Sequence, residues 1–422
     1  MWLFKIKKVF KDSDLRKKIF LALFGLIVFR LGANIPIPGI DADRLSAFLS
    51  GNQFFGLLNI FSGGGLSNLS LFMLGVGPYI TATIIMQLFT MVFPRLKEMY
   101  SEDGEAGRTK FNQYARLLTV PLAVLQAFAL LTLLTKQGVI GALSPLETVT
   151  NIIVVTAGSI LLMWIGELIT DLGIGNGVSL LIFSGIVASL PTYVQQIIFT
   201  FEPTQLPIVI ASLVVGVVVI YGVVIVTEAE RPIPISYAKQ IRGSRMYGGA
   251  STHLPIRVNQ AGVIPIIFAL SILLFPQLIG SFLASSSNAI LIVISKMLAV
   301  FNNNLLLYGS LYFVLVFLFS YFYTAVTFDP ESISTNLQKS GAFVPGIRPG
   351  PSTAQYIGHV VNRVTLLGAG FLGAVAVLPL VMQSATGITA LAIGGTGLLI
   401  VVSVVLETVK LINSQITMRE YE

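Results

Sequence analysis

Apolar runs of roughly 20 residues recur along the whole chain, and a bundle of membrane-crossing helices is the structure that such a repeat favours. Each run matches an α-helix across a hydrocarbon core of about 30 Å and is too long for a strand of a membrane barrel. Hydrophobic residues make up 55% of the chain and charged residues 11%, which is too little polar surface for a soluble globule. We therefore expect an all-α polytopic membrane protein with ten spans, at 19–36, 75–93, 117–135, 150–169, 178–198, 207–227, 261–283, 304–327, 364–384 and 388–409.

The basic residues are distributed asymmetrically about these spans. All but four of the 26 Lys and Arg residues fall on one side of the predicted membrane; Arg44, Lys136 and Lys296 lie on the other side, and Arg30 lies within the first span. Because basic residues concentrate in cytoplasmic loops, both termini are predicted to be cytoplasmic, and the net charge of +7 requires no nucleic-acid partner. Residues 1–18 lack a small-residue cleavage site, which favours a retained cytoplasmic amphipathic helix over a secretory signal.

The residue inventory argues against an enzyme. The chain has two His residues, no Cys, and no sequence typical of a metalloprotease, a P-loop or a serine hydrolase. Acidic residues of the spans, such as Glu167, lie toward cytoplasmic ends, whereas an ion-coupled pump usually carries one near mid-membrane. The sequence GIGNG at 173–177 follows no strand and predicts a tight turn between two spans. We expect no catalytic residue, no metal site and no cofactor.

Two features remain that ordinary spans do not explain. Residues 59–89 are apolar but are interrupted by glycines at 63–65 and by Gly75, Gly77 and Pro78, which predicts a half-helix too short to cross the membrane. Two cytoplasmic loops, 228–260 and 328–363, are much longer than ordinary connections and carry basic residues beside Gly and Pro. Such loops suit the docking of a large cytosolic partner.

Five sequences from these regions, taken together, resemble the SecY/Sec61-alpha family, the channel subunits of the Sec protein translocase. They are IPIPGID, FSGGGLSNLSLFMLGVGPYITA, GIGNGVSLLIF, THLPIRVN and KSGAFVPGIRPG, and they occur in family order over nearly the whole chain. The resemblance implies two inverted halves of five spans each, 19–199 and 207–409, joined by an external hinge loop at 200–206. It also implies a re-entrant plug half-helix at about 59–72 and a cytoplasmic tail at 410–422.

The resemblance further implies an apolar pore ring between the halves. Aliphatic side chains one helical turn apart share a helix face, where they can close a ring that excludes ions without binding the passing chain. The alternative is that these aliphatic residues face lipid or pack in the interior, as residues at helical spacing usually do. The implied ring is Val76, Ile80, Val178, Ile182, Val263, Ile267 and Ile400, and the implied plug is Phe61, Ser62, Gly63, Gly64, Gly65, Leu66, Ser67, Asn68 and Leu69.

A lateral gate toward lipid and a docking surface for cytosolic partners are implied in the same way. For three polar gate candidates, Gln87, Gln126 and Ser271, ordinary interhelical hydrogen bonding is an equal alternative. For the docking candidates, the alternative is the positive-inside bias alone. The remaining gate candidates are Thr81 and Phe275, and the docking candidates are Lys239, Arg242, Arg245, Lys339 and Arg348.

The function implied by the resemblance is a protein-conducting channel in the bacterial plasma membrane. It would pass unfolded secretory polypeptides with their signal peptides, release transmembrane segments sideways into the lipid bilayer, and be driven by the SecA ATPase or by a ribosome whose RNA contacts the basic loops. SecE and SecG would be its small membrane subunits. Two alternatives are a secondary transporter of a small solute, which also has inverted repeats and broken helices, and a scaffold without a pore. Polar groups converging at mid-depth would favour the transporter.

Overall fold

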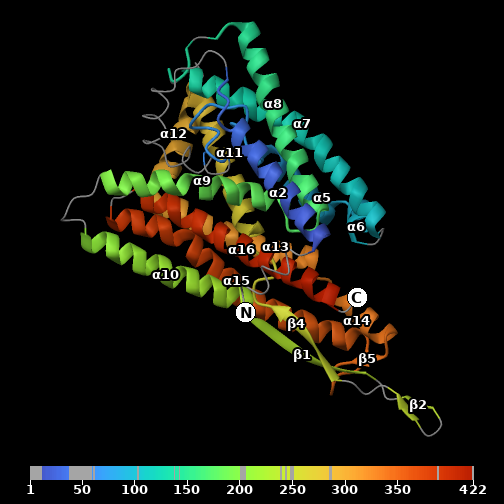
Figure 1. The fold of residues 1–422 in the computed structure, drawn as a ribbon. Helices are drawn as coiled ribbons and strands as arrows, with labels where there is room; N and C mark the ends of the chain where they lie inside the picture. The colour runs from blue at the N-terminus through green and yellow to red at the C-terminus, as the bar shows by residue number, and fades with distance from the viewer. Residues whose placement is uncertain are drawn as a thin grey trace. The chain divides into compact units, whose positions relative to one another are not determined.

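The computed structural model describes residues 12–37, 59, 62–101, 104–136, 138–141, 143–199, 206–237, 240–242, 245–247, 251–284, 288–386 and 389–420. Helices dominate these residues, which confirms the predicted fold class (Figure 1). The helices are α2 (Ser13–Gly32), α5 (Gly77–Val92), α6 (Pro94–Ser101), α7 (Gly104–Lys136), α8 (Pro145–Asp171), α9 (Gly177–Phe199), α10 (Leu206–Glu228), α11 (Ile264–Ala284), α12 (Ala289–Asn303), α13 (Leu305–Thr327), α14 (Pro330–Lys339), α15 (Pro351–Thr386) and α16 (Thr389–Glu420).

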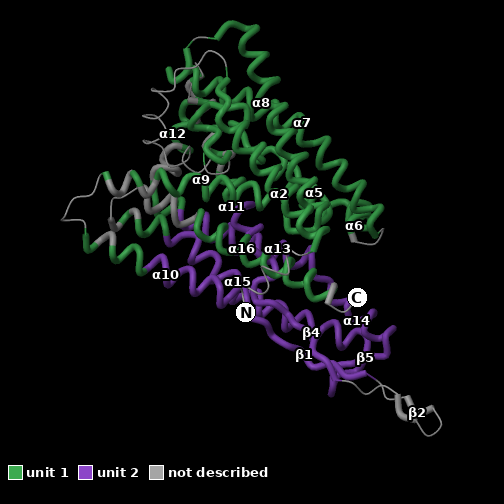
Figure 2. The backbone as a smooth tube through the Cα atoms, in the orientation of Figure 1, with its two compact units in different colours: residues 1–214, 270–308, 379–422 green, residues 215–269, 309–378 purple. Residues whose placement is uncertain are grey.

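The chain forms two compact units (Figure 2). The first unit comprises residues 1–214, 270–308 and 379–422, and the second comprises residues 215–269 and 309–378. Their boundaries pass through α10, α11, α13 and α15 rather than through the hinge loop expected at 200–206, which lies outside the described residues. The two inverted halves therefore stay a prediction.

Each of the ten predicted spans coincides with a helix. Six helical segments of the described chain are long and apolar enough to cross a membrane. Helices α5 and α6 would add a seventh as one broken span, bent by 116°. The protein is therefore a multi-pass membrane protein, and ten crossings are consistent with its helices. Helix α12, 15 residues long and apolar, was not predicted.

Local sequence explains where two of these helices begin and end. The side chain of Asp12 accepts hydrogen bonds from the backbone N–H groups of Asp14 and Leu15, so α2 begins at Ser13. Residues 13–18 thus continue into the first span, while the rest of the amphipathic helix expected at 1–18 lies outside the described residues. Helix α5 begins with Pro78 in its first turn and ends before Pro94, because proline suits the first turn but disfavours helix in the residue before it.

The two long cytoplasmic loops contain strands that the all-α prediction missed. Strand β1 (Glu230–Tyr237) pairs antiparallel with β4 (Ser251–Arg257) and with β5 (Ala342–Phe343), in the order β4-β1-β5. Strands β2 (Gln240–Arg242) and β3 (Arg245–Tyr247) form a separate hairpin. Because β5 belongs to the second loop, the first sheet joins the two loops.

A hydrophobic core supports this sheet. Ile233 of β1 and Ile256 of β4 are buried with Ile357 and Val361 of α15, and residues of α14 pack against the same cluster. Alternate residues of β1, Ile233 and Ile235, face inward, as the period of a half-buried strand requires. Strands β1, β4 and β5, together with α14, residues 344–350 and the start of α15, therefore form a packed unit, which we call the loop platform.

Candidate functional site

The glycine-rich segment before α5 is the first part of the candidate site. Residue 59 is helical, residues 62–69 and 71–76 form turns, and Ser70 forms a bridge, while residue 60 and Phe61 lie outside the described residues. The half-helix predicted at about 59–72 therefore does not extend over residues 62–72. Gly63 has a φ of 64° and Gly64 a φ of 85°, in the left-handed region that favours glycine. Three glycines in succession also weaken a helix, which explains why turns replace it. We call residues 62–76 the turn segment.

The turn segment is attached by backbone hydrogen bonds to the residues that follow α2. The N–H of Ile37 donates to the oxygen of Leu69 at 2.9 Å, and the N–H of Leu71 donates to the oxygen of Ile35 at 3.0 Å. These bonds flank an antiparallel bridge between Pro36 and Ser70. The segment is therefore held to residues 35–37 as an added strand would be.

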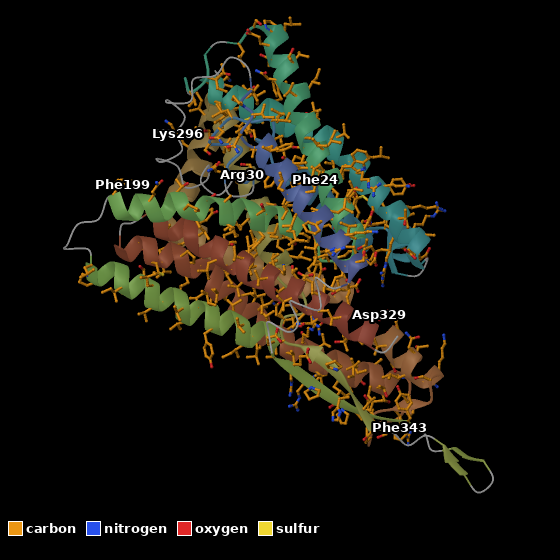
Figure 3. All side chains as sticks on the ribbon, viewed as in Figure 1. Phe24, Arg30, Phe199, Lys296, Asp329 and Phe343 are labelled. Atoms are coloured by element: carbon orange, nitrogen blue, oxygen red, sulfur yellow. The ribbon has the colours of Figure 1, made fainter. Side chains whose placement is uncertain are left out.

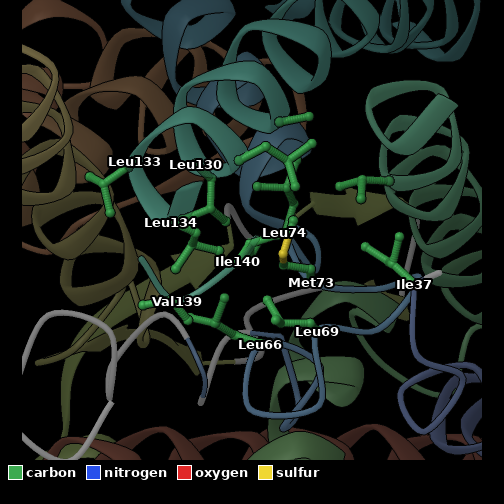
Figure 4. Packing of buried hydrophobic residues seen from close by; sticks show 13 residues of the cluster. Ile37, Leu66, Leu69, Met73, Leu74, Leu130, Leu133, Leu134, Val139 and Ile140 are labelled. Carbon is green, nitrogen blue, oxygen red and sulfur yellow. The ribbon is translucent and has the colours of Figure 1, made fainter. Parts of the chain in front are cut away.

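The apolar side chains of the turn segment are buried among α7, α8 and the loop between them (Figure 4). Leu66, Leu69 and Met73 share a hydrophobic cluster with Leu130 and Leu134 of α7. On α8, the hydroxyl of Ser159 donates to the oxygen of Gly75 at 3.1 Å. The neighbouring Gly158 lets the helix approach closely, because a Cβ atom there would overlap the carbonyl oxygen of Leu71. The first unit thus encloses the segment in its interior.

Six of the seven residues expected in the pore ring are buried, and Val178 is half-buried. Val76 is the residue that caps α5, and Ile80 follows one turn later on the same helix. Burial excludes the alternative in which the six face lipid, but ordinary interior packing stays open. Val76, Ile80, Val178, Ile182 and Ile400 belong to the first unit and Val263 and Ile267 to the second, so a ring of all seven stays a prediction.

Two of the ring candidates come from helices that pack together. Helices α9 and α16 approach closely where a Cβ atom at Gly397 would lie 2.9 Å from Cγ2 of Ile186. The contacts of Gly175 with Thr408 and of Gly173 with Gln415 show that the two helices run antiparallel. Along α9, Ile182 lies one turn before Ile186, and along α16, Ile400 lies nearly one turn after Gly397. Because the helices are antiparallel, these two steps go in the same direction, so Ile182 and Ile400 lie at the same level of the helix pair.

The lateral-gate candidates lie on three helices. Thr81 of α5 donates its hydroxyl hydrogen to the oxygen of Gly77 at 3.0 Å, within its own helix. On the same helix, Oε1 of Gln87 is buried without a hydrogen-bond partner, so the interhelical hydrogen bond proposed as the alternative is not made by this atom. Ser271 of α11 is buried, and Gln126 of α7 is half-buried. The side chain of Phe275 lies outside the described residues, and the gate stays a prediction.

Two of the docking candidates, Arg348 and Lys339, are exposed on the loop platform. Arg348 is exposed in the turn after β5, where the hydroxyls of Thr353 and Ser334 donate to the oxygens of Arg348 at 2.8 Å and of Gly350 at 2.6 Å. Lys339 is exposed in the last turn of α14. Arg242 of β2 and Arg245 of β3 are paired in the register of the β2–β3 hairpin, and Lys239 lies outside the described residues. Hydrogen bonds thus position Arg348, while docking itself stays a prediction.

Two contacts made by charged residues were not predicted. Arg116 of α7 forms a salt bridge of 2.7 Å with Glu167 of α8. Arg30 of α2, recognised from the sequence only as a charge within a span, donates from Nη1 to the oxygen of Gly63 at 3.0 Å. Figure 3 labels Arg30. Within the described residues, no group of three or more His, Cys, Asp or Glu side chains could hold a metal ion.

This geometry defines a multi-pass helical membrane protein with a non-helical segment folded among its helices. A model of the SecY family matches residues 70–409. The protein translocase subunit SecY of Corynebacterium glutamicum is 43% identical over 447 residues, which cover 99% of this chain and 98% of that protein. The chain belongs to the SecY family.

Solved structures share the fold. One is a SecY channel whose plug domain is described as stabilising the closed state and maintaining a membrane seal; it has a TM-score of 0.65, is 21% identical, and the match covers 94% of this chain and 92% of that chain. Another is Sec61 in a canine ribosome–channel complex, with a TM-score of 0.61, 19% identity, and coverage of 94% and 92%. The prediction of a protein-conducting channel is confirmed by the family, and the transporter alternative is not favoured.

Proposed function

We propose that the channel formed by this chain conducts unfolded secretory polypeptides across the bacterial plasma membrane, releases transmembrane segments sideways into lipid, and is sealed by the turn segment. The observation that carries this proposal is the position of the turn segment. It is non-helical, it lies within the hydrophobic interior of the first unit, and it leads directly into α5 with Val76 and Ile80. Irregular backbone inside a membrane protein is tolerated where protein or water, not lipid, surrounds it.

The channel is passive in this proposal and has no catalytic residue or cofactor. The driving force comes from the SecA ATPase or from a translating ribosome docked on the cytoplasmic loops. Arg348 and Lys339 carry exposed positive charge on a packed platform, which suits contact with acidic protein surfaces or with RNA phosphates. SecE and SecG complete the membrane complex, and both termini of this chain face the cytoplasm.

Ion conductance of the purified channel in a planar bilayer tests the proposal. Deletion of residues 60–70 removes most of the seal, so the resting conductance is expected to rise well above that of the unmodified channel. Substitution of Ile182 and Ile400 by Gly widens the apolar constriction and is expected to raise it as well. A bilayer that stays as tight as wild type after the deletion contradicts the assignment of the plug.

A further inference from the structure

Arg30 is a charged residue within the first predicted span, a position where charge is costly and usually functional. Among the residues that the structure describes, it forms no ion pair with an acidic side chain. Its guanidinium instead donates through Nη1 to the backbone oxygen of Gly63 at 3.0 Å. A bond between a charged donor and a backbone oxygen is stronger than one between neutral groups.

A position near the C-terminal end of α2 would itself favour a basic residue, because the helix dipole is negative there. The helix dipole explains why residue 30 is basic, but it does not explain why Arg30 bonds to Gly63, which lies 33 residues further along the chain. The first turn of the segment also sits directly on α2, since a Cβ atom at Gly63 would overlap the ring of Phe29. The guanidinium therefore meets a segment that is already packed beside it.

The turn segment is attached in two places of different chemistry, one on α2 and one on the residues that follow α2. Its middle is attached through backbone hydrogen bonds at residues 69 and 71, and through Asn68, whose Nδ2 donates to Oδ1 of Asn34 at 3.1 Å. Its first turn is bonded to α2 by the Arg30–Gly63 hydrogen bond. The left-handed glycines at 63 and 64 allow this first turn to swing without side-chain strain.

We propose that Arg30 is a positioning residue that latches the first turn of the plug to α2 and so sets how often the resting channel opens. The inference rests on the function proposed above, in which the turn segment seals the pore. Loss of a hydrogen bond to a charged group shifts such an equilibrium by about 10- to 100-fold.

The latch is tested by single-channel recording of the assembled complex in planar bilayers without substrate. Arg30→Gln is expected to raise the open fraction by about 10- to 100-fold. Arg30→Lys keeps the charge but replaces the fork of donors with a point charge, so its open fraction should lie between those of wild type and Arg30→Gln. Lys17→Gln, which removes an exposed charge from the other end of α2, is the control and should behave as wild type.

Two comparisons separate the possible failures. If Arg30→Gln stays as tight as wild type while deletion of residues 60–70 leaks, the latch is wrong and the plug stands. If the deletion also stays tight, the proposed seal is wrong as well. A leak of equal size in Arg30→Gln and Lys17→Gln also overturns the latch, because any lost charge would then have the same effect.

A cross-link distinguishes a released latch from a misfolded protein. The chain contains no cysteine, so Asn34→Cys and Asn68→Cys introduce a unique pair at side chains already in contact. In the Arg30→Gln background, a short bismaleimide is expected to join the pair as readily as it does with Arg30 present, because the latch holds only the first turn and its loss leaves the middle of the segment in place. The linked Arg30→Gln channel should therefore still leak. Loss of cross-linking in Arg30→Gln would mean that the whole segment is displaced, which contradicts a latch at the first turn.

Discussion

Ser236 of β1 lies directly opposite Phe343 of β5, and this pair joins two cytoplasmic loops more than a hundred residues apart in sequence. The next pair, Tyr237 with Ala342, completes the contact. Ala342 of β5 and Val344, which follows the strand, are both buried. The surface proposed to receive cytosolic partners is thus formed by both loops together.

Cysteines at the paired positions are expected to form a disulfide bond. Opposite residues of antiparallel strands have Cβ atoms about 4.5–5.5 Å apart, close to the separation that a disulfide needs. The variant Ser236→Cys/Phe343→Cys should therefore oxidise readily, and the two fragments made by proteolysis between the sites should stay joined until reduction. The control is Ser236→Cys/Ser340→Cys. Because residue 340 lies outside β5, this pair of cysteines should form a disulfide poorly. Equal linking of both pairs would show that the register is wrong.

The salt bridge between Arg116 and Glu167 predicts an unequal effect of single and double substitutions. Glu167 is largely buried, with 12% of its side chain exposed, whereas Arg116 is 44% exposed. Arg116→Gln leaves a nearly buried carboxylate without its counter-charge and should destabilise the protein by about 1–3 kcal/mol. The double variant Arg116→Gln/Glu167→Gln should recover most of this loss. Thermal unfolding in detergent micelles measures the loss of stability in the single variant and in the double variant.

Lys110→Gln provides the control for this comparison, because it removes an exposed charge from the same helix. Its unfolding midpoint should stay close to that of wild type. If the double variant loses as much stability as Arg116→Gln and the second single variant, Glu167→Gln, lose together, the two side chains are not coupled.

The helices could be predicted from the sequence because hydropathy acts locally. A run of about 20 apolar residues must form a helix in lipid, whatever its neighbours do, and each expected span is a helix. The turn at 173–177 was also predicted from a local pattern: Gly173 has a φ of 73° and follows Leu172, the residue that caps the end of α8. The expected half-helix does not extend over residues 62–72, where the left-handed Gly63 and Gly64 favour turns.

The contacts between distant segments could not be predicted from local patterns. Strand β5 is two residues long, and its partner β1 lies in another loop, so neither periodicity nor length indicates the pairing. The alternation of Ile233 with Ile235, and of Leu254 with Ile256, was the available sign of strands in the first loop. The hydrogen bond between Arg30 and Gly63 depends on tertiary structure, so local patterns do not indicate it. The pore ring is not settled by the structure either, because burial alone does not separate a pore ring from ordinary packing.

The capping box at the start of α8 predicts a local loss of stability. The backbone N–H of Glu147 donates to the hydroxyl of Ser144 at 3.3 Å, and the Glu147 carboxylate accepts from the N–H of Ser144 at 2.8 Å. Ser144→Ala should lower the free energy of unfolding by about 1 kcal/mol. Ser144→Asp retains a capping acceptor and should lose little. Hydrogen exchange of the first turn of α8 locates the effect, and equal exchange in Ser144→Ala and wild type contradicts it.

Glycines at two helical positions should respond to alanine in opposite directions. At Gly177, the first residue of α9, a Cβ atom would overlap the carbonyl oxygen of Gly166 in α8, so Ala forces the two helices apart. We expect a loss of at least about 2 kcal/mol, as for an overpacked interior. At Gly216 of α10 a Cβ atom meets nothing within 4 Å, and Ala should stabilise the helix by about 0.5–1 kcal/mol. If both unfolding midpoints rise, helix propensity outweighs the close approach of α8 and α9, and glycine is not required at residue 177.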